Sequence, residues 1–154
     1  MMRPSPTLDD ESLIAVLRLA SGQDPVPGHV SAAARAAFAL RLPGAVAARP
    51  VVVPAPAGVR SAEQSCLLRF DAGALTVDLE VGSSDGLVDL AGQISPWPGA
   101  GSWVEVRTPC LTESRELSQA GQFAVTGLPP GWFSVVCHHR DHPPVATSWT
   151  RIRP

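Results

Sequence analysis

The second half of the chain alternates apolar and polar residues in short runs, which is the pattern of β-strands. Each run is rich in Val, Leu, Phe or Trp, and each is bounded by Gly, Pro, Ser or Asp. Short strands at this spacing are typical of an all-β sandwich or barrel. We therefore predict a mainly β fold, a sandwich of seven strands over residues 66–70, 75–81, 86–94, 102–107, 121–126, 131–137 and 145–152.

The first two of these runs are predicted to form a hairpin. Residues 71–74, with the sequence Asp-Ala-Gly-Ala, supply the turn between them. The 75–81 run alternates strictly, so that its apolar residues share one face of the strand and its polar residues share the other. An antiparallel sheet with one buried and one solvated face follows from this alternation.

Residues near the N-terminus follow a helical spacing instead. Leu13, Ile14 and Leu17 fall on one side of a helix, and the acidic residues before them suit the positive end of the helix dipole. The hydroxyl of Thr7 can cap this helix, with Asp10 reaching back to form a capping box.

A second, Ala-rich stretch runs from residue 29 to about residue 42 and carries Val30 and Phe38 on one side. A Pro-rich turn over residues 24–28 separates it from the first helix, so that residues 1–44 are predicted to form a helical hairpin. Two helices this short are not stable alone, because helix nucleation is unfavourable. Their apolar face must therefore dock on the β-domain or on another protein, which is the main indication of a partner.

Residues 45–62 are predicted to link the two parts. Pro50, Pro54 and Pro56 surround three valines, and this composition favours an extended or polyproline-like linker over a strand. The predicted organisation is a helical hairpin over residues 1–44, a Pro-rich linker over residues 45–62 and a β-sandwich domain over residues 63–154.

Composition excludes several classes of function. The formal net charge of −2 argues against a nucleic-acid binder, because neutralising phosphates requires a basic face. No run is long and apolar enough to span a membrane, and no N-terminal segment resembles a signal peptide. The three cysteines have no metal or redox spacing, so we expect a cytoplasmic protein with reduced thiols. No catalytic or cofactor-binding motif is present, and we expect neither an enzyme nor a cofactor.

One cluster of chemically versatile residues lies at 137–142, with the sequence Cys-His-His-Arg-Asp-His. Its candidate metal ligands are Cys137, His139 and His142, since thiolate and imidazole both bind zinc. Their spacing matches no known zinc pattern, and a polar hairpin loop is the favoured interpretation. A hydrolase that uses Cys137 with His139 is a further alternative, although a cysteine at the end of an apolar strand is more often inert.

Four tryptophans stand out in a chain with few aromatic residues. Trp103, Trp132 and Trp149 lie on predicted strands, where we expect them in the core or half-buried. Trp97 lies between two prolines on a predicted exposed loop. Such a residue can anchor a partner or fold back on its own sheet, and the sequence leaves both open.

Several motifs in the β-region recur in one known fold. Gly121 allows a turn, Phe123 anchors the strand that follows, and Pro129-Pro130-Gly131 connects to a strand in which Phe133 is set inward. This rhythm resembles the carboxypeptidase-regulatory or transthyretin-like β-sandwich. The resemblance implies an accessory or binding module, because such sandwiches serve many functions.

A second resemblance extends over the whole chain and is carried by residues 9–14, 24–27, 33–39 and 58–60, together with the β-region. In these residues the chain resembles a family of small actinobacterial proteins of unassigned function. The family is thought to lie beside sigma factors and CHAT-type protease-like proteins. The resemblance implies a non-enzymatic accessory or regulatory protein that binds a partner from its own locus, with an anti-sigma-like regulator as the alternative. The candidate partner-binding residues are Leu13, Ile14, Leu17, Val30, Phe38 and Trp97.

Overall fold

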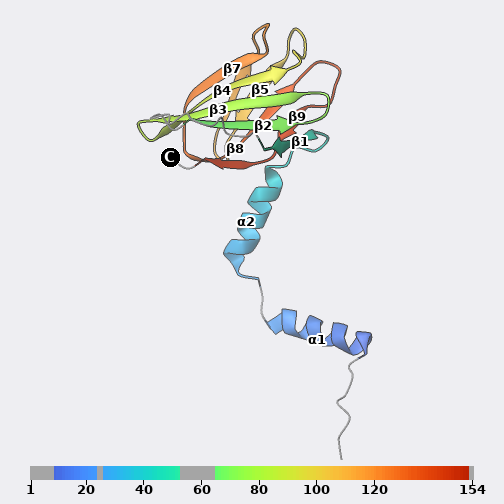
Figure 1. The fold of residues 1–154 in the computed structure, drawn as a ribbon. Helices are drawn as coiled ribbons and strands as arrows, with labels where there is room; N and C mark the ends of the chain where they lie inside the picture. Colours follow the sequence, from blue (N-terminus) through green and yellow to red (C-terminus); the bar gives the residue numbers. More distant parts are fainter. Residues whose placement is uncertain (1–8, 24–25, 53–64, 153–154) are drawn as a thin grey trace, which may run out of the picture. The chain divides into compact units, whose positions relative to one another are not determined.

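The computed structural model describes residues 9–23, 26–52 and 65–152. The chain divides into two compact units, Met1–Arg41 and Leu42–Pro154. The first unit holds helices α1 (Asp10–Gln23) and α2 (Gly28–Ala39), and the second holds strands only (Figure 1). The mainly β class with two N-terminal helices is confirmed. Within the described ranges, neither helix combines the length and the apolar content that crossing a membrane requires.

Helix α1 is capped by Asp9, the residue just before it. Asp9 Oδ1 accepts a hydrogen bond from the backbone N–H of Ser12 at 2.7 Å, which satisfies a donor that the helix itself leaves free. Hydrogen bonding to Ser12, from its side chain first and its backbone second, lowers the pKa of Asp9. Thr7, the predicted cap, lies outside the described residues. The acidic start of the helix is as expected, with Asp10 and Glu11 in the first turn.

Ten strands form one sheet in the part of the second unit that the structure describes. Their order is β6-β5-β8-β9-β1-β2-β3-β4-β7, with β10 paired to β8. The end strands β6 and β7 contact each other, so that the sheet curls almost into a barrel (Figure 1). The strands are β1 (Val46–Val51), β2 (Cys66–Asp71), β3 (Thr76–Ser84), β4 (Leu87–Ser95), β5 (Trp103–Arg107), β6 (Thr112–Glu116), β7 (Gln122–Leu128), β8 (Gly131–His138), β9 (Val145–Thr147) and β10 (Thr150–Ile152).

Strand β1 joins the two halves of the sheet. Its first half, from Val46 to Ala48, pairs in parallel with β9, and its second half, from Arg49 to Val51, pairs antiparallel with β2. A linker was expected over residues 45–62, and for the residues of β1 that prediction is wrong. Pro50 is tolerated because the second half of β1 pairs with one neighbour only, and prolines are confined to such edges.

The predicted count of seven strands is wrong for reasons that the sheet makes clear. Strand β1 was taken as linker, and β6 has the sequence Thr-Glu-Ser-Arg-Glu, which contains no apolar residue. A polar strand of this kind at the end of a sheet has no hydrophobic period to reveal it, although charges are what protect such edges from pairing with other chains. The third difference is that the run 145–152 is two strands, β9 and β10.

A bulge separates β9 from β10. Val136 pairs with Ala146 and Phe133 pairs with Thr150, so that three residue steps along β8 are opposite four steps along the β9–β10 segment. The side chain of Thr147 fills the interruption, because its hydroxyl accepts a hydrogen bond from the backbone N–H of Val135 at 2.9 Å. An extra residue that disrupts the ladder in this way is the definition of a β-bulge.

The predicted hairpin of β2 and β3 is confirmed, with antiparallel pairing from Cys66–Val81 to Asp71–Thr76. Strand β3 continues into β4 through a tight turn at Asp85 and Gly86, which have φ angles of 53° and 77°. Two successive residues with positive φ are the mark of a type I′ turn, whose twist matches that of the flanking strands.

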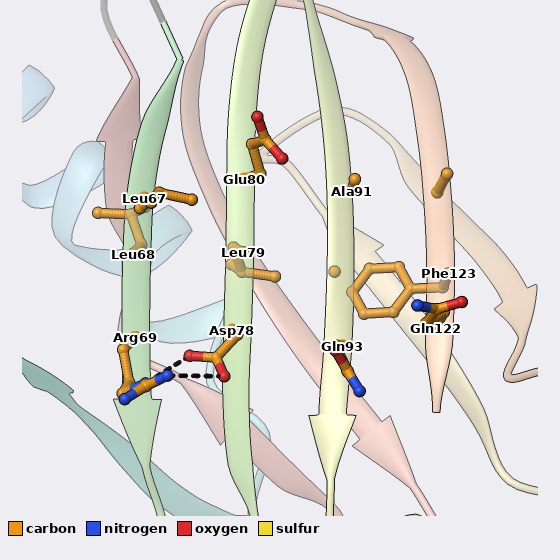
Figure 2. Close-up of a pocket in the computed structure, with 12 residues that line it drawn as sticks. Leu67, Leu68, Arg69, Asp78, Leu79, Glu80, Ala91, Gln93, Gln122 and Phe123 are labelled. Carbon is orange, nitrogen blue, oxygen red and sulfur yellow. Dashed lines mark hydrogen bonds and ion pairs between the residues drawn. The ribbon is translucent and has the colours of Figure 1, made fainter. Parts of the chain in front are cut away.

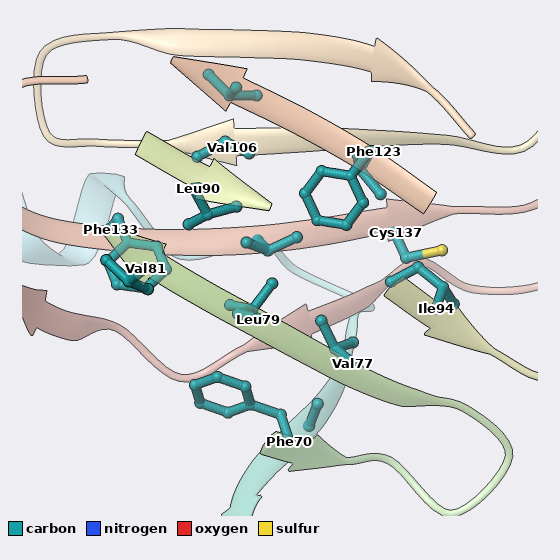
Figure 3. Close-up of a cluster of buried hydrophobic side chains, with 14 of the residues drawn as sticks. Phe70, Val77, Leu79, Val81, Leu90, Ile94, Val106, Phe123, Phe133 and Cys137 are labelled. Carbon is teal, nitrogen blue, oxygen red and sulfur yellow. The ribbon is translucent and has the colours of Figure 1, made fainter. Parts of the chain in front are cut away.

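The core lies between the two halves of the curled sheet. Figure 3 shows Phe70, Leu79 and Leu90 from one half facing Val106 and Phe133 from the other. Phe133 is buried and faces inward, as predicted. Each fully buried side chain of this size contributes about 1.5–3 kcal/mol, so that this cluster supplies the main stabilisation of the unit.

Candidate interaction surfaces

The apolar side chains that were predicted to bind a partner through the helices are exposed. On α1 the exposed fractions are 46% for Leu13, 48% for Ile14 and 59% for Leu17. On α2 they are 45% for Val30 and 68% for Phe38, and none of its residues is buried. We call these five residues the apolar helix positions.

Trp97, the sixth predicted residue, lies in the loop between β4 and β5 and is 45% exposed. Among the other tryptophans, Trp103 and Trp149 are half-buried as expected. Trp132 is 49% exposed, and its predicted burial is wrong. It occupies the outer face of β8, opposite Arg151, where no described strand packs over it.

Cys137 lies in the core near the end of β8, as predicted for an inert cysteine at the end of an apolar strand. It pairs with Val104 of β5 and is completely buried. Burial raises the pKa of its thiol to about 11, because the interior disfavours the thiolate. At neutral pH the sulfur is therefore protonated, which is the unreactive form both for nucleophilic attack and for metal binding.

The histidines beside Cys137 point in different directions. His139 and His142 stack on each other with ring centroids 5.0 Å apart. Burial first, and then the charge of His142, lower the pKa of His139. Among the described residues no three His, Cys, Asp or Glu side chains are grouped so that they could hold a metal ion.

His138 takes part in an arrangement that sequence reasoning missed. It faces outward from β8 and stacks on Trp103 of β5, with ring centroids 3.9 Å apart and planes inclined by 7°. Its Nε2 atom is 3.5 Å from a carboxylate oxygen of Glu105, a distance at which a protonated imidazole forms an ion pair. The Nε2 atom has no hydrogen-bond partner among the described residues. The signal in the sequence was the aromatic residue at the start of one strand and the histidine at the end of another, but only the register brings them together.

Unpartnered polar atoms gather at this same end of the sheet. The buried side-chain atoms without a hydrogen-bond partner, within the described ranges, are Ser102 Oγ, His138 Nε2 and His139 Nε2. Ser102 immediately precedes β5, His138 is the last residue of β8, and His139 follows it. Buried polar groups are normally satisfied, so that such a concentration distinguishes this end of the unit from the rest.

A second surface feature is a depression of about 650 Å³ on the outer face of β2, β3, β4 and β7 (Figure 2). Arg69 and Asp78 form a two-point ion pair there, with N–O distances of 2.6 and 3.1 Å. The lining side chains include no Ser, Cys or His that could act as a nucleophile or base. They form two rows across the strands, Leu67-Glu80-Ala91-Ala124 and Arg69-Asp78-Gln93-Gln122.

Comparison of the chain with protein-family models, with curated proteins and with solved structures found no match. Function is therefore inferred from the surface of this chain, from the apolar helix positions and from the stacked pair of Trp103 and His138.

Proposed function

We propose that this protein is a non-enzymatic accessory or regulatory protein that acts by binding another protein through the apolar helix positions. The observation that supports this function is the exposure of large apolar side chains on both helices, which reaches 59% at Leu17 and 68% at Phe38. Exposed apolar residues that cluster on one element are typical of a binding surface, whereas single ones are common on any protein.

The length of the helices supports the same proposal. Helix α1 has 14 residues and α2 has 12, which is near the limit below which isolated helices are marginal in water. Covering an exposed leucine or phenylalanine side chain stabilises a complex by about 1.5–3 kcal/mol before the costs of association. A partner that covers several of these positions therefore stabilises the helices and the complex together.

In this proposal the β-unit is a transthyretin-like scaffold in the cytoplasm that carries the helices. The resemblances in the sequence support this reading, because such sandwiches serve as accessory and binding modules. They also suggest that the partner is encoded in the same locus, as a sigma factor or a CHAT-type protease-like protein. Catalysis finds little support, because burial raises the pKa of the Cys137 thiol to about 11.

The test is an affinity capture from the native host with the full chain and two variants of α1. Leu17→Glu introduces a charge at an apolar helix position. Ala15→Glu introduces the same charge two residues away, on the opposite side of the helix, and is the matched control. Ala15 is also exposed, so both variants retain the fold.

The proposal expects the wild type and Ala15→Glu to recover the same protein and Leu17→Glu to lose it. Because burying an unpaired charge is costly, purified Leu17→Glu should bind that protein at least about tenfold more weakly. Equal recovery by all three chains would show that the helices do not carry the binding. Recovery of a sigma factor would make the protein a transcriptional regulator, and recovery of a protease-like neighbour would make it an accessory subunit.

A further inference from the structure

Trp103 lies between two different neighbours on the outer face of the sheet. His138 of β8 is opposite it on one side, and Glu116 of β6 is opposite it on the other. The His138 ring covers one face of the indole, because the two rings are nearly parallel and 3.9 Å apart. The second face of the indole is therefore directed away from β8 and toward β6.

A depression of about 330 Å³ lies on that second side. Trp103, Ser114, Arg115 and Glu116 are among the residues that line it. Ser114 and Glu116 are two residues apart on β6, so their side chains share the outer face with the indole. An aromatic face and a carboxylate thus border the same hollow.

No guanidinium lies over the indole of Trp103 among the described residues, although Arg115 lines the hollow and a guanidinium nitrogen of Arg140 lies near Gly101. Glu116 forms no ion pair among the residues that the structure describes. The charge of Arg115 is paired with Glu113, because its Nη1 atom donates to a carboxylate oxygen of Glu113 at 3.1 Å and to the carbonyl oxygen of Ser114 at 2.7 Å. Among the described residues, the guanidinium that lies over an aromatic ring is that of Arg41, over Phe38.

We propose that this hollow binds an organic cation, a guanidinium or an alkylammonium group, between the indole of Trp103 and the carboxylate of Glu116. Trp is the side chain whose face attracts cations most strongly. A carboxylate at the edge of the hollow adds charge-assisted hydrogen bonds to a ligand that has N–H donors. Neutral and anionic groups lack both attractions. The cation comes from a small amine or from an arginine side chain of another protein.

The test uses the full chain and follows the indole N–H resonance of Trp103 in an NMR titration, with Trp103→Phe to assign the signal. The probes are choline, its neutral isostere 3,3-dimethylbutan-1-ol, and N-acetyl-argininamide. We expect choline or the argininamide to shift the Trp103 resonance saturably and the neutral isostere to leave it in place. Tighter binding of the argininamide than of choline assigns the site to a protein side chain, and the reverse assigns it to a small amine.

Two surface variants make the result specific. Glu116→Gln removes the charge at the hollow and should weaken binding of the cation by about two- to fivefold, as expected for an exposed ionic contact. Glu80→Gln removes a carboxylate on β3, away from the hollow, and it should leave the affinity unchanged. The inference is overturned if the neutral isostere shifts the resonance as the cations do, or if Glu116→Gln binds them as tightly as the wild type. Leu17→Glu should not alter this titration, so that the cation site and the helical binding function can fail separately.

Discussion

Gly92 of β4 is the position at which the packing of the core allows the sharpest prediction. It lies between Leu79 and Phe123 in the ladder, and the ring of Phe123 occupies the space that a side chain at residue 92 would need. A Cβ atom there would collide with the Phe123 ring and would lie 2.9 Å from Cδ2 of Leu79. Gly92→Ala should therefore destabilise the β-unit.

The expected magnitude follows from two opposing effects. Forcing an extra carbon into a packed core costs about 1–3 kcal/mol, while replacing Gly by Ala in a strand returns about 0.5–1 kcal/mol. Taking the middle of each range, the net loss is about 1 kcal/mol, which lowers Tm by roughly 2–4 °C for a chain of this size. Thermal unfolding followed by circular dichroism measures this shift directly.

Gly82 of β3 is the matched control, because a Cβ atom there would meet nothing within 4 Å. Gly82→Ala should leave Tm unchanged or raise it. In the double variant Gly92→Ala/Phe123→Leu, the smaller side chain at residue 123 should recover part of the lost stability. We expect a coupling free energy of about 1 kcal/mol between the two sites. If Gly92→Ala melts at or above the temperature of the wild type, the packing of Phe123 over residue 92 is wrong.

Three further predictions concern other parts of the chain. Gly121→Ala should lower Tm by several degrees, because residue 121 has a φ of 75° and a Cβ atom there collides with backbone; unchanged melting would contradict this. A thiol reagent at pH 8 should label Cys66 and Cys110, which are exposed, and should reach Cys137 only after unfolding; mass spectrometry counts the adducts, and native labelling of Cys137 would refute its burial. The pKa of Asp9 is lowered, so the stability that Asp9 gives to α1 is present above the ordinary pKa of 3.8 and is lost as pH falls through the lowered pKa. Helical ellipticity should therefore fall on acidification in the wild type. It should not fall in Asp9→Asn, in which the asparagine caps the helix without a charge.

The two proposed binding functions use different chemistry and are independent. The apolar helix positions recognise a partner by covering hydrocarbon, so that binding there should be insensitive to salt. The hollow beside Trp103 recognises charge, and added salt should weaken cation binding at its exposed carboxylate. Comparing the two interactions at low and high ionic strength therefore separates them without any substitution.

Local spacing determined a large part of this fold in advance. The strict alternation of residues 75–81 predicted β3 and its buried face, and residues 71–74 predicted the turn between β2 and β3. Both succeed because they depend on neighbours in the chain: side chains alternate along a strand, and a tight turn needs residues that tolerate positive φ. The acidic start of α1 was equally local, since a helix leaves free N–H groups wherever it begins.

Strands β1 and β6 were not predicted, because their stability comes from other strands of the sheet. Strand β6 carries no apolar residue, and it forms because β5 offers it an edge to pair with. Strand β1 contains a proline and exists because it bridges β9 and β2. Both strands depend on pairing with distant parts of the chain, which the hydrophobic period of their own residues does not reveal.

The candidate sites divide in the same way. The sequence by itself determined which residue types were present: apolar residues at helical spacing, a tryptophan in a Pro-rich loop, and a run of cysteine and histidines. Only the tertiary structure decided that His138 faces outward onto Trp103 and that Glu116 lies on the other side of that indole. The physical reason is register, because a shift of one residue between β5 and its neighbours would turn each of these side chains to the opposite face.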